Sequence, residues 1–139
     1  MTAVEIAAAY RSGAISPVEV LNSVLERAAR IDERLNAFCY MNSENAVAQA
    51  RLSEDRWRRK AQISPLDGVP VSVKDNIGTV DMPTRFGSRA VTDEECWLPD
   101  DPSVARLRDA GAIFVGKTCC PDFSHKLVTD SPLTGITRN

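Results

Sequence analysis

The sequence has no excess of positive charge, no long apolar run and only one histidine. It carries 17 Lys and Arg against 19 Asp and Glu, for a net charge of -2, whereas nucleic-acid-binding surfaces are strongly basic. No apolar stretch approaches the roughly 20 residues of a membrane-spanning helix, and residues 1–6 lack the basic and apolar regions of a signal peptide. We therefore expect a globular cytoplasmic protein without nucleic-acid or membrane partners.

Cysteine is present four times, in a spacing that fits no zinc site. Cys39 and Cys96 are isolated, and the neighbours Cys119 and Cys120 are poorly placed to bridge each other. We expect free thiols in a reducing compartment, and neither a metal nor a cofactor. The single histidine, His125, lies close to Cys120 in the sequence. A catalytic Cys–His pair therefore stays open as an alternative, although such pairs usually come from distant segments.

Residues 1–62 carry the pattern of three helices. Thr2 heads a capping box that starts the first helix, and Ser16 with Pro17 predicts the start of the second. The apolar residues of the second helix recur at three- and four-residue spacing: Val20, Leu21, Val24, Leu25, Ala28, Ile31 and Leu35. A third helix is expected over about 43–60. We interpret these helices as packing elements, because none carries a cluster of reactive side chains.

Residues 63–139 change to an α/β pattern. A valine-rich strand is expected over 69–74, and Pro102 starts a helix that leads into an apolar strand over 112–115. Such a βαβ unit places its two strands parallel, with a right-handed crossover. The predicted fold class is therefore α/β, with N-terminal helices followed by a βαβ unit that belongs to a larger mixed sheet flanked by helices. We expect the valine-rich strand to be central and covered on both faces.

Lys74 ends the valine-rich strand, at the carboxyl end where open α/β sheets place their ligand sites. Burial there would lower the pKa of the amine toward the range of a usable base. From the pattern alone, a lysine that reaches solvent or pairs with Asp75 is the favoured interpretation. Because Lys117 ends the second strand, the two amines are expected near one mouth. Ser72 shares the Lys74 face and is expected to be a structural hydroxyl.

Residues 111–118 match the phosphate-loop pattern G-x-x-x-x-G-K-[ST] letter for letter. The backbone N–H groups of that loop must curl around a phosphate, between a strand and a helix. Here the four middle residues are Ala, Ile, Phe and Val, which favour an extended, buried strand. Four extended residues hold the two glycines about 13 Å apart. We therefore expect a strand at this place and no nucleotide site.

Five segments of the chain resemble one known enzyme family in their order and spacing. They are ISPVEVLNSVLERAARIDERLNAF at 15–38, ENAVAQARLSEDR at 44–56, PLDGVPVSVKDNIGTVDMPTRFGS at 65–88, DDPSVARLRDAGAIFVGKT at 100–118 and TDSPLTGITRN at 129–139. That family is the amidase signature family, which hydrolyses carboxamides through a Ser–cis-Ser–Lys triad without a metal. The lysine of its VKDN-type strand corresponds to Lys74, so the resemblance implies that Lys74 is the catalytic base. The family usually has Asn after the GKT motif, where this chain has Cys119.

The resemblance implies that residues 1–139 are the N-terminal portion of a single amidase domain. Both serines of the family lie in a Gly/Ser-rich stretch after the segment that 137–139 resemble, and this sequence contains no such stretch. The isolated chain is therefore expected to be inactive. The expected partners are a small-molecule amide substrate in the complete enzyme, and the rest of its own domain or a homo-oligomer. The alternatives are a non-catalytic truncated paralogue or assembly module and, less favoured, a P-loop-type nucleotide binder. The sequence does not distinguish a stand-alone amidase from part of an amidotransferase.

Overall fold

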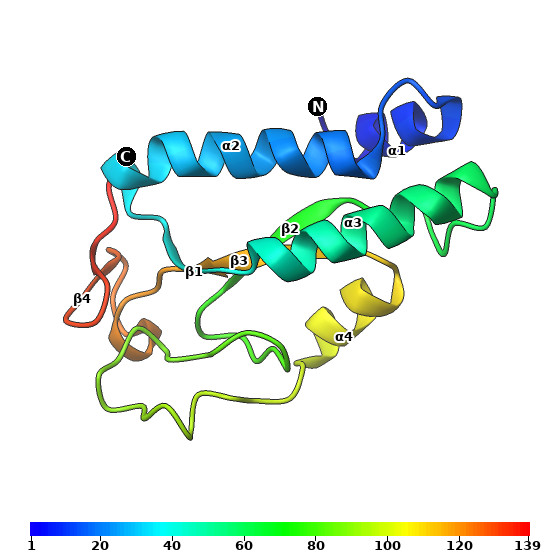
Figure 1. The fold of residues 1–139 in the computed structure, drawn as a ribbon. Helices are drawn as coiled ribbons and strands as arrows, with labels where there is room; N and C mark the ends of the chain where they lie inside the picture. Colours follow the sequence, from blue (N-terminus) through cyan, green and yellow to red (C-terminus); the bar gives the residue numbers. More distant parts are fainter.

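A three-stranded sheet lies between helical layers in the computed structural model, which describes residues 1–139 (Figure 1). The elements in chain order are α1 (Ala3–Ser12), α2 (Pro17–Leu35), β1 (Phe38–Met41), α3 (Ser43–Arg58), β2 (Pro70–Lys74), α4 (Pro102–Asp109), β3 (Ile113–Thr118), the 3-10 helix η1 (Asp122–Ser124), β4 (Asp130–Ser131) and β5 (Gly135–Ile136). The sheet has the order β1-β3-β2, and β2 runs parallel and β1 antiparallel to β3. The predicted α/β class, with a mixed sheet flanked by helices, is confirmed.

The N-terminal helices begin at the residues that their capping pattern predicts. The hydroxyls of Thr2 and Ser16 accept from the backbone N–H groups of Glu5 and Glu19, whose carboxylates accept from the N–H groups of the capping residues. Each capping box satisfies N–H groups that a helix start leaves unpaired. α2 and α3 then lie side by side over one face of the sheet (Figure 1).

Two apolar clusters, one on each face, hold the sheet in place. The first joins α2, α3 and β3 through Leu21, Ala46, Ala50, Ile113 and Val115. The second joins β2, α4, β3 and the segment after β2 through Val73, Met82, Val104 and Phe114. Burial of a large aliphatic or aromatic side chain contributes about 1.5–3 kcal/mol. Because β3 supplies residues to both clusters, it is the centre of the fold.

β2 lies at an edge of this sheet, so the prediction of a central, doubly covered strand is wrong. Only Val73 of β2 is fully buried, and Ser72 and Lys74 are exposed, whereas residues 113–117 of β3 are all buried. Both strands are apolar runs, and the apolar run alone does not indicate which strand lies in the centre of the sheet. β1 was not predicted, because its four residues show no alternation of apolar and polar side chains.

One extra residue on β3 decides where Lys117 points. The pairing of β2 with β3 shifts by one residue, so that Val115 has no partner in β2. An extra residue reverses the alternation of faces along the strand beyond it. Lys117 would otherwise share the face of Val115, under α2 and α3. It pairs instead with Val73 and lies on the α4 face.

The segment between β2 and α4 has no helix or strand, yet it packs tightly against the sheet. Met82 is completely buried, and so are Thr79 and Thr84. Asp101 precedes α4 but does not cap it with its side chain, because that carboxylate accepts from the N–H of Gly78 at 2.7 Å. This hydrogen bond joins the two ends of the segment.

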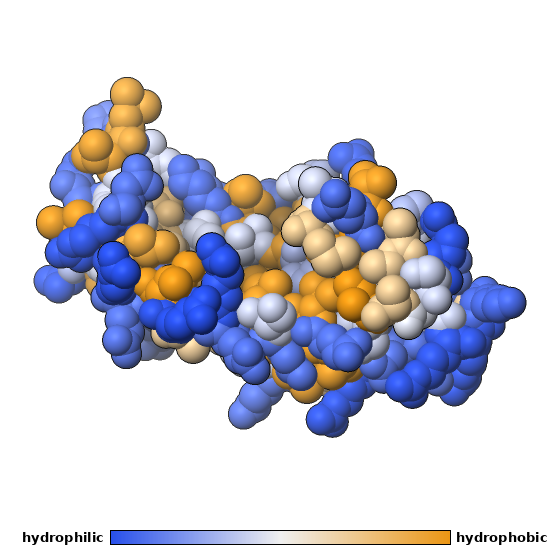
Figure 2. Space-filling view, turned by 90° about the horizontal axis from the view of Figure 1, so that it is seen from above, coloured by the Kyte–Doolittle hydropathy of each residue, from blue (hydrophilic) through white to orange (hydrophobic).

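The face that carries α1 and α2 is mostly hydrophilic at its rim, and apolar residues gather toward its middle (Figure 2). A groove of about 360 Å³ between these helices is lined by Ile6, Ile15, Val20 and Val24 together with Met1, Glu19 and Ser23. It offers packing surface but no lysine, cysteine or histidine. None of the helices combines the length and the apolar character that a bilayer crossing requires.

Candidate active site

Lys74 is the last residue of β2, where the parallel strands reach their carboxyl ends. Its side chain is exposed and takes part in no hydrogen bond or ion pair. The pattern-based interpretation of a lysine that reaches solvent is confirmed for these residues, and they do not bury the amine, because β2 is an edge strand and its Ser72–Lys74 face is uncovered. Ser72 is exposed beside it on the same face, with its hydroxyl likewise unbonded.

Asp75 does not pair with Lys74 and instead holds the chain that follows. Its buried carboxylate accepts from the backbone N–H of Arg85 at 3.0 Å and from that of Gly87 at 2.8 Å. Its own N–H donates to the carbonyl of Thr118 at 2.9 Å, which extends the pairing of β2 with β3 by one residue. Asp75 therefore fixes residues 85–87 beside the ends of the two strands.

Lys117 is the buried amine of this molecule. The residue has no exposed surface, and its Nζ donates to the carbonyl of Ile77 at 2.5 Å, to Thr84 Oγ1 at 2.8 Å and to Thr79 Oγ1 at 3.2 Å. The Thr79 hydroxyl donates onward to the carbonyl of Met82, and the Thr84 hydroxyl to that of Ile77. Both hydroxyl oxygens are thus left to accept. Three acceptors match the three N–H donors of an ammonium group.

Burial lowers the pKa of Lys117, because the charge loses its contact with water, and the negative charge of Asp75 opposes this effect. All donors of the amine are nevertheless committed to oxygens inside the protein. An amine held in this way has no access to a proton on a substrate or on another catalytic group. Lys117 is therefore a structural residue that links β3 to residues 77–84 through its hydrogen bonds.

The two lysines lie on opposite faces of the sheet, so the expectation that they meet at one mouth is wrong. Lys117 shares the face of its partner Val73. Lys74 follows Val73 along β2 and points to the other face, because successive side chains of a strand alternate. The extra residue on β3 produces this separation, and no sequence pattern signalled it.

The phosphate-loop match at residues 111–118 is explained by strand packing. Ile113–Thr118 form β3, as predicted. Gly111 has a φ of +84°, which lets the chain turn from α4 into the strand. At Gly116 a Cβ atom would overlap the carbonyl oxygen of Tyr40 in the neighbouring strand. The lysine of the motif is the buried Lys117, so these residues form no phosphate cradle.

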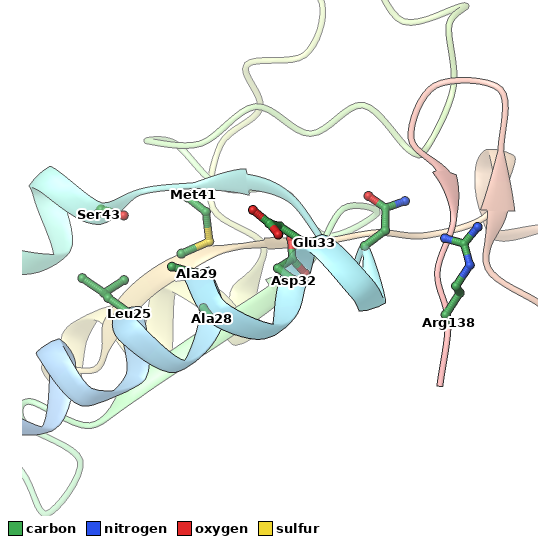
Figure 3. Close-up of a pocket in the computed structure, with 9 residues that line it drawn as sticks. Leu25, Ala28, Ala29, Asp32, Glu33, Met41, Ser43 and Arg138 are labelled. Carbon is green, nitrogen blue, oxygen red and sulfur yellow. The ribbon is translucent and has the colours of Figure 1, made fainter.

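Two hollows of the molecule are candidate sites. A cleft of about 370 Å³ adjoins Asp75, and it is lined by Cys39, Tyr40, Asp75, Pro83, Arg85, Leu133 and Thr134. A larger hollow of about 620 Å³ runs between α2, the start of α3 and Arg138, and it is lined by Leu25, Ala28, Ala29, Asp32, Glu33, Asn36, Met41, Ser43 and Arg138 (Figure 3). The larger hollow contains no lysine, cysteine or histidine, and its Asp32 already accepts from two backbone N–H groups. We therefore place the candidate site at the strand ends near Asp75. Lys74 precedes Asp75 in the chain, although it does not line the cleft itself.

The alternative of a Cys–His pair is not supported by the geometry. Cys120 is fully buried, and burial raises the pKa of its thiol. His125 is exposed, and its backbone N–H donates to the carbonyl of Asp122. A catalytic thiol needs the opposite conditions, a lowered pKa and an adjacent base. All four cysteines are free thiols.

The sequence matches the family model described as Amidase over residues 19–139. It is 38% identical over 141 residues to a glutamyl-tRNA(Gln) amidotransferase subunit of Thermobifida fusca, covering all of this chain and 28% of that protein. It is 37% identical over 139 residues to an indoleacetamide hydrolase of Bradyrhizobium diazoefficiens, covering 99% of this chain and 26% of that protein. The fold is also similar to the crystal structure of the native peptide amidase from Stenotrophomonas maltophilia. That similarity has a TM-score of 0.88 and 30% sequence identity, and it covers all of this chain and 30% of the other.

Proposed function

The chain belongs to the amidase family, and from this premise we propose that it is the N-terminal portion of a single amidase domain. In this proposal about residues 1–62 supply the helical layer, and residues 63–139 supply the start of the α/β core. The complete enzyme hydrolyses the C–N bond of a small-molecule carboxamide through a Ser–cis-Ser–Lys triad, with Lys74 as the base. The chain spans about 28% of the length of curated relatives that it matches.

The observation that carries the proposal is the contrast between the two lysines at the strand ends. The amine of Lys117 is occupied by three internal oxygens. Lys74 has an exposed amine with no partner, at the edge of the sheet where α/β folds bind ligands. A catalytic base must be able to reach the proton that it removes. Of these two amines, only Lys74 meets that requirement.

The chemistry assigns a further role to the exposed face of β2. A serine hydroxyl is a weak nucleophile until a base removes its proton, and a lysine acts as that base only when it is uncharged. Desolvation is what favours the uncharged form. We expect the serine-bearing segment of the complete domain to cover the Ser72–Lys74 face. That segment would then desolvate the amine and supply the serine whose proton the amine removes.

A chimeric enzyme tests this role. Residues 1–139 would replace the matching N-terminal segment of the indoleacetamide hydrolase, and release of ammonia from indoleacetamide would be measured. General-base catalysis contributes about 10²–10⁴-fold, so Lys74→Ala should lose at least about 10²-fold in kcat. Lys126→Ala, which removes an exposed amine elsewhere, is the matched control and should keep the activity of the chimera.

The two outcomes separate the proposed function from its alternative. Activity that survives Lys74→Ala contradicts the assignment of the base. A folded chimera that is inactive with Lys74 intact favours a non-catalytic paralogue or assembly module. The 139-residue chain by itself should release no ammonia above background, because it has no Gly/Ser-rich segment to supply the nucleophile.

A further inference from the structure

Cys39 and Cys119 belong to neighbouring strand segments, next to the paired residues Phe38 and Thr118, and the side chain of each shifts the pKa of the other. Cys39 lies at a register shift in the pairing of β1 with β3, where its residue has no partner. Cys119 follows the last residue of β3, and its N–H donates to the carbonyl of Ala37 at 2.8 Å. The sulfur of Cys39 turns toward β3 and lies 3.4 Å from the carbonyl oxygen of Lys117. The bulge thus aims one thiol at the strand that carries the other.

The two thiols differ in how easily each loses its proton. The neighbouring side chain of Cys39 is the main influence that lowers the pKa of the Cys119 thiol, to about 7, against the effect of burial. The side chain of Cys119, together with burial, raises the pKa of Cys39. Cys119 is therefore the member of the pair that more readily becomes the thiolate, which is the reactive form of cysteine.

Access to the pair is suited to a small reagent. Cys39 and Thr134 line the cleft of about 370 Å³ beside Asp75, whereas Cys119 does not line it and has only 8% of its surface exposed. The other thiols are less suited to reaction. Cys120 is fully buried and has a raised pKa, and the buried Cys96 donates to the carbonyl of Asp93.

We propose that Cys39 and Cys119 form a peroxide-sensitive thiol pair that closes to a disulfide between β1 and the end of β3. The Cys119 thiolate attacks one oxygen of hydrogen peroxide and breaks the O–O bond, which leaves a sulfenic acid and a hydroxide that takes up a proton. The sulfur of Cys39 then attacks the sulfenic sulfur, and its proton leaves with the hydroxyl group as water. Two thiols lose two electrons in total, and the peroxide is reduced to two waters.

The experiment treats the 139-residue chain with hydrogen peroxide at pH 7 and follows its mass and its peptide map. We expect the loss of two hydrogens and a single linked pair of peptides that contain Cys39 and Cys119. In Cys39→Ser the hydroxyl can still donate a hydrogen bond to Cys119 but cannot form a disulfide. The mass of that variant should therefore not fall by two hydrogens. It should instead accumulate a sulfenic acid at Cys119, which dimedone traps. Cys96→Ser leaves the pair intact and is the matched control, so it should behave like the parent.

A second measurement addresses the pair without oxidation. The rate at which iodoacetamide alkylates Cys119 should rise with pH around a midpoint below the roughly 8.5 of an ordinary cysteine, in the parent and in Cys39→Ser. The midpoint should move to higher pH in Cys39→Ala, which has no donor. The proposal is overturned if peroxide links Cys119 to Cys120, gives a mixture of pairings such as an unfolded chain would give, forms no disulfide, or removes two hydrogens from Cys39→Ser.

Discussion

Replacement of Lys117 by methionine should destabilise the fold, although it removes a charge from the interior. The three hydrogen bonds of the amine connect β3 to residues 77–84. A hydrogen bond from a charged donor contributes about 1.5–3 kcal/mol, and these three would be lost together. Methionine in turn relieves the desolvation penalty of a buried ammonium, which amounts to several kcal/mol in proteins.

The difference between these two effects sets the expected size of the loss. The carbonyl of Ile77 keeps the Thr84 hydroxyl as a donor, so only the two threonine oxygens lose every donor. We expect a net decrease of about 2–4 kcal/mol in the free energy of unfolding. For a chain of this size, a loss in that range lowers Tm by about 10 °C. Circular dichroism during thermal and urea unfolding measures both quantities.

A surface lysine provides the control, and pH provides a second test. Lys126 forms an exposed ion pair with Asp130, so Lys126→Met should cost less than about 1 kcal/mol. Burial holds the pKa of Lys117 below 10.5. In the window between that lowered value and 10.5 the unfolded chain binds more protons than the folded one, so stability rises with pH. The parent should therefore gain stability relative to Lys117→Met as the pH approaches 10.5. Equal stability of the two proteins at every pH would refute the role given to Lys117.

Two further substitutions test how the scaffold is held. Burial alone would raise the pKa of Asp67, but hydrogen bonds from Arg56 and other donors hold this pKa below its usual value of 3.8. Asp67→Asn should therefore lower the free energy of unfolding by about 3 kcal/mol. The parent loses this contribution as the pH falls below about 4, whereas the variant should show no such pH dependence. The exposed pair of Asp55 with Arg59 is the comparison, and Asp55→Asn should change the urea midpoint only slightly. Gly116→Ala should destabilise the chain strongly, because its Cβ would overlap the backbone of β1; an unchanged Tm would contradict the close approach of β1 and β3.

The elements that depend on neighbouring residues were predicted well from the sequence. The starts of α1 and α2 follow from capping boxes whose partners lie three residues apart. The parallel pairing of β2 with β3 follows from the order of strand, helix and strand. The choice of a strand over a phosphate loop at residues 113–118 follows from side chains that favour extended structure.

The elements that depend on distant partners were not predicted. β1 is a four-residue strand whose pairing comes from β3, more than 70 residues away in the chain. The position of β2 at the edge also depends on which strands are present beside it. Register shifts occur in both pairings of β3, and no local pattern in the strands announces them. The place of Lys74 at the strand end and its exposure therefore agree with the pattern-based interpretation, whereas the central position expected for its strand does not.

The two strand-end lysines show why residue type alone does not identify a buried amine. Lys74 follows an alternating run of valines, and Lys117 follows an apolar run that ends in glycine, so the two strands look alike in sequence, and burial was considered for Lys74 alone. What distinguishes them is the supply of acceptors, since an ammonium is tolerated inside a protein only where oxygens replace its water. Thr79 and Thr84 provide those oxygens to Lys117 from a segment that begins after β2. Nothing in this chain provides them to Lys74, so its amine remains available to whatever packs against the exposed face of β2.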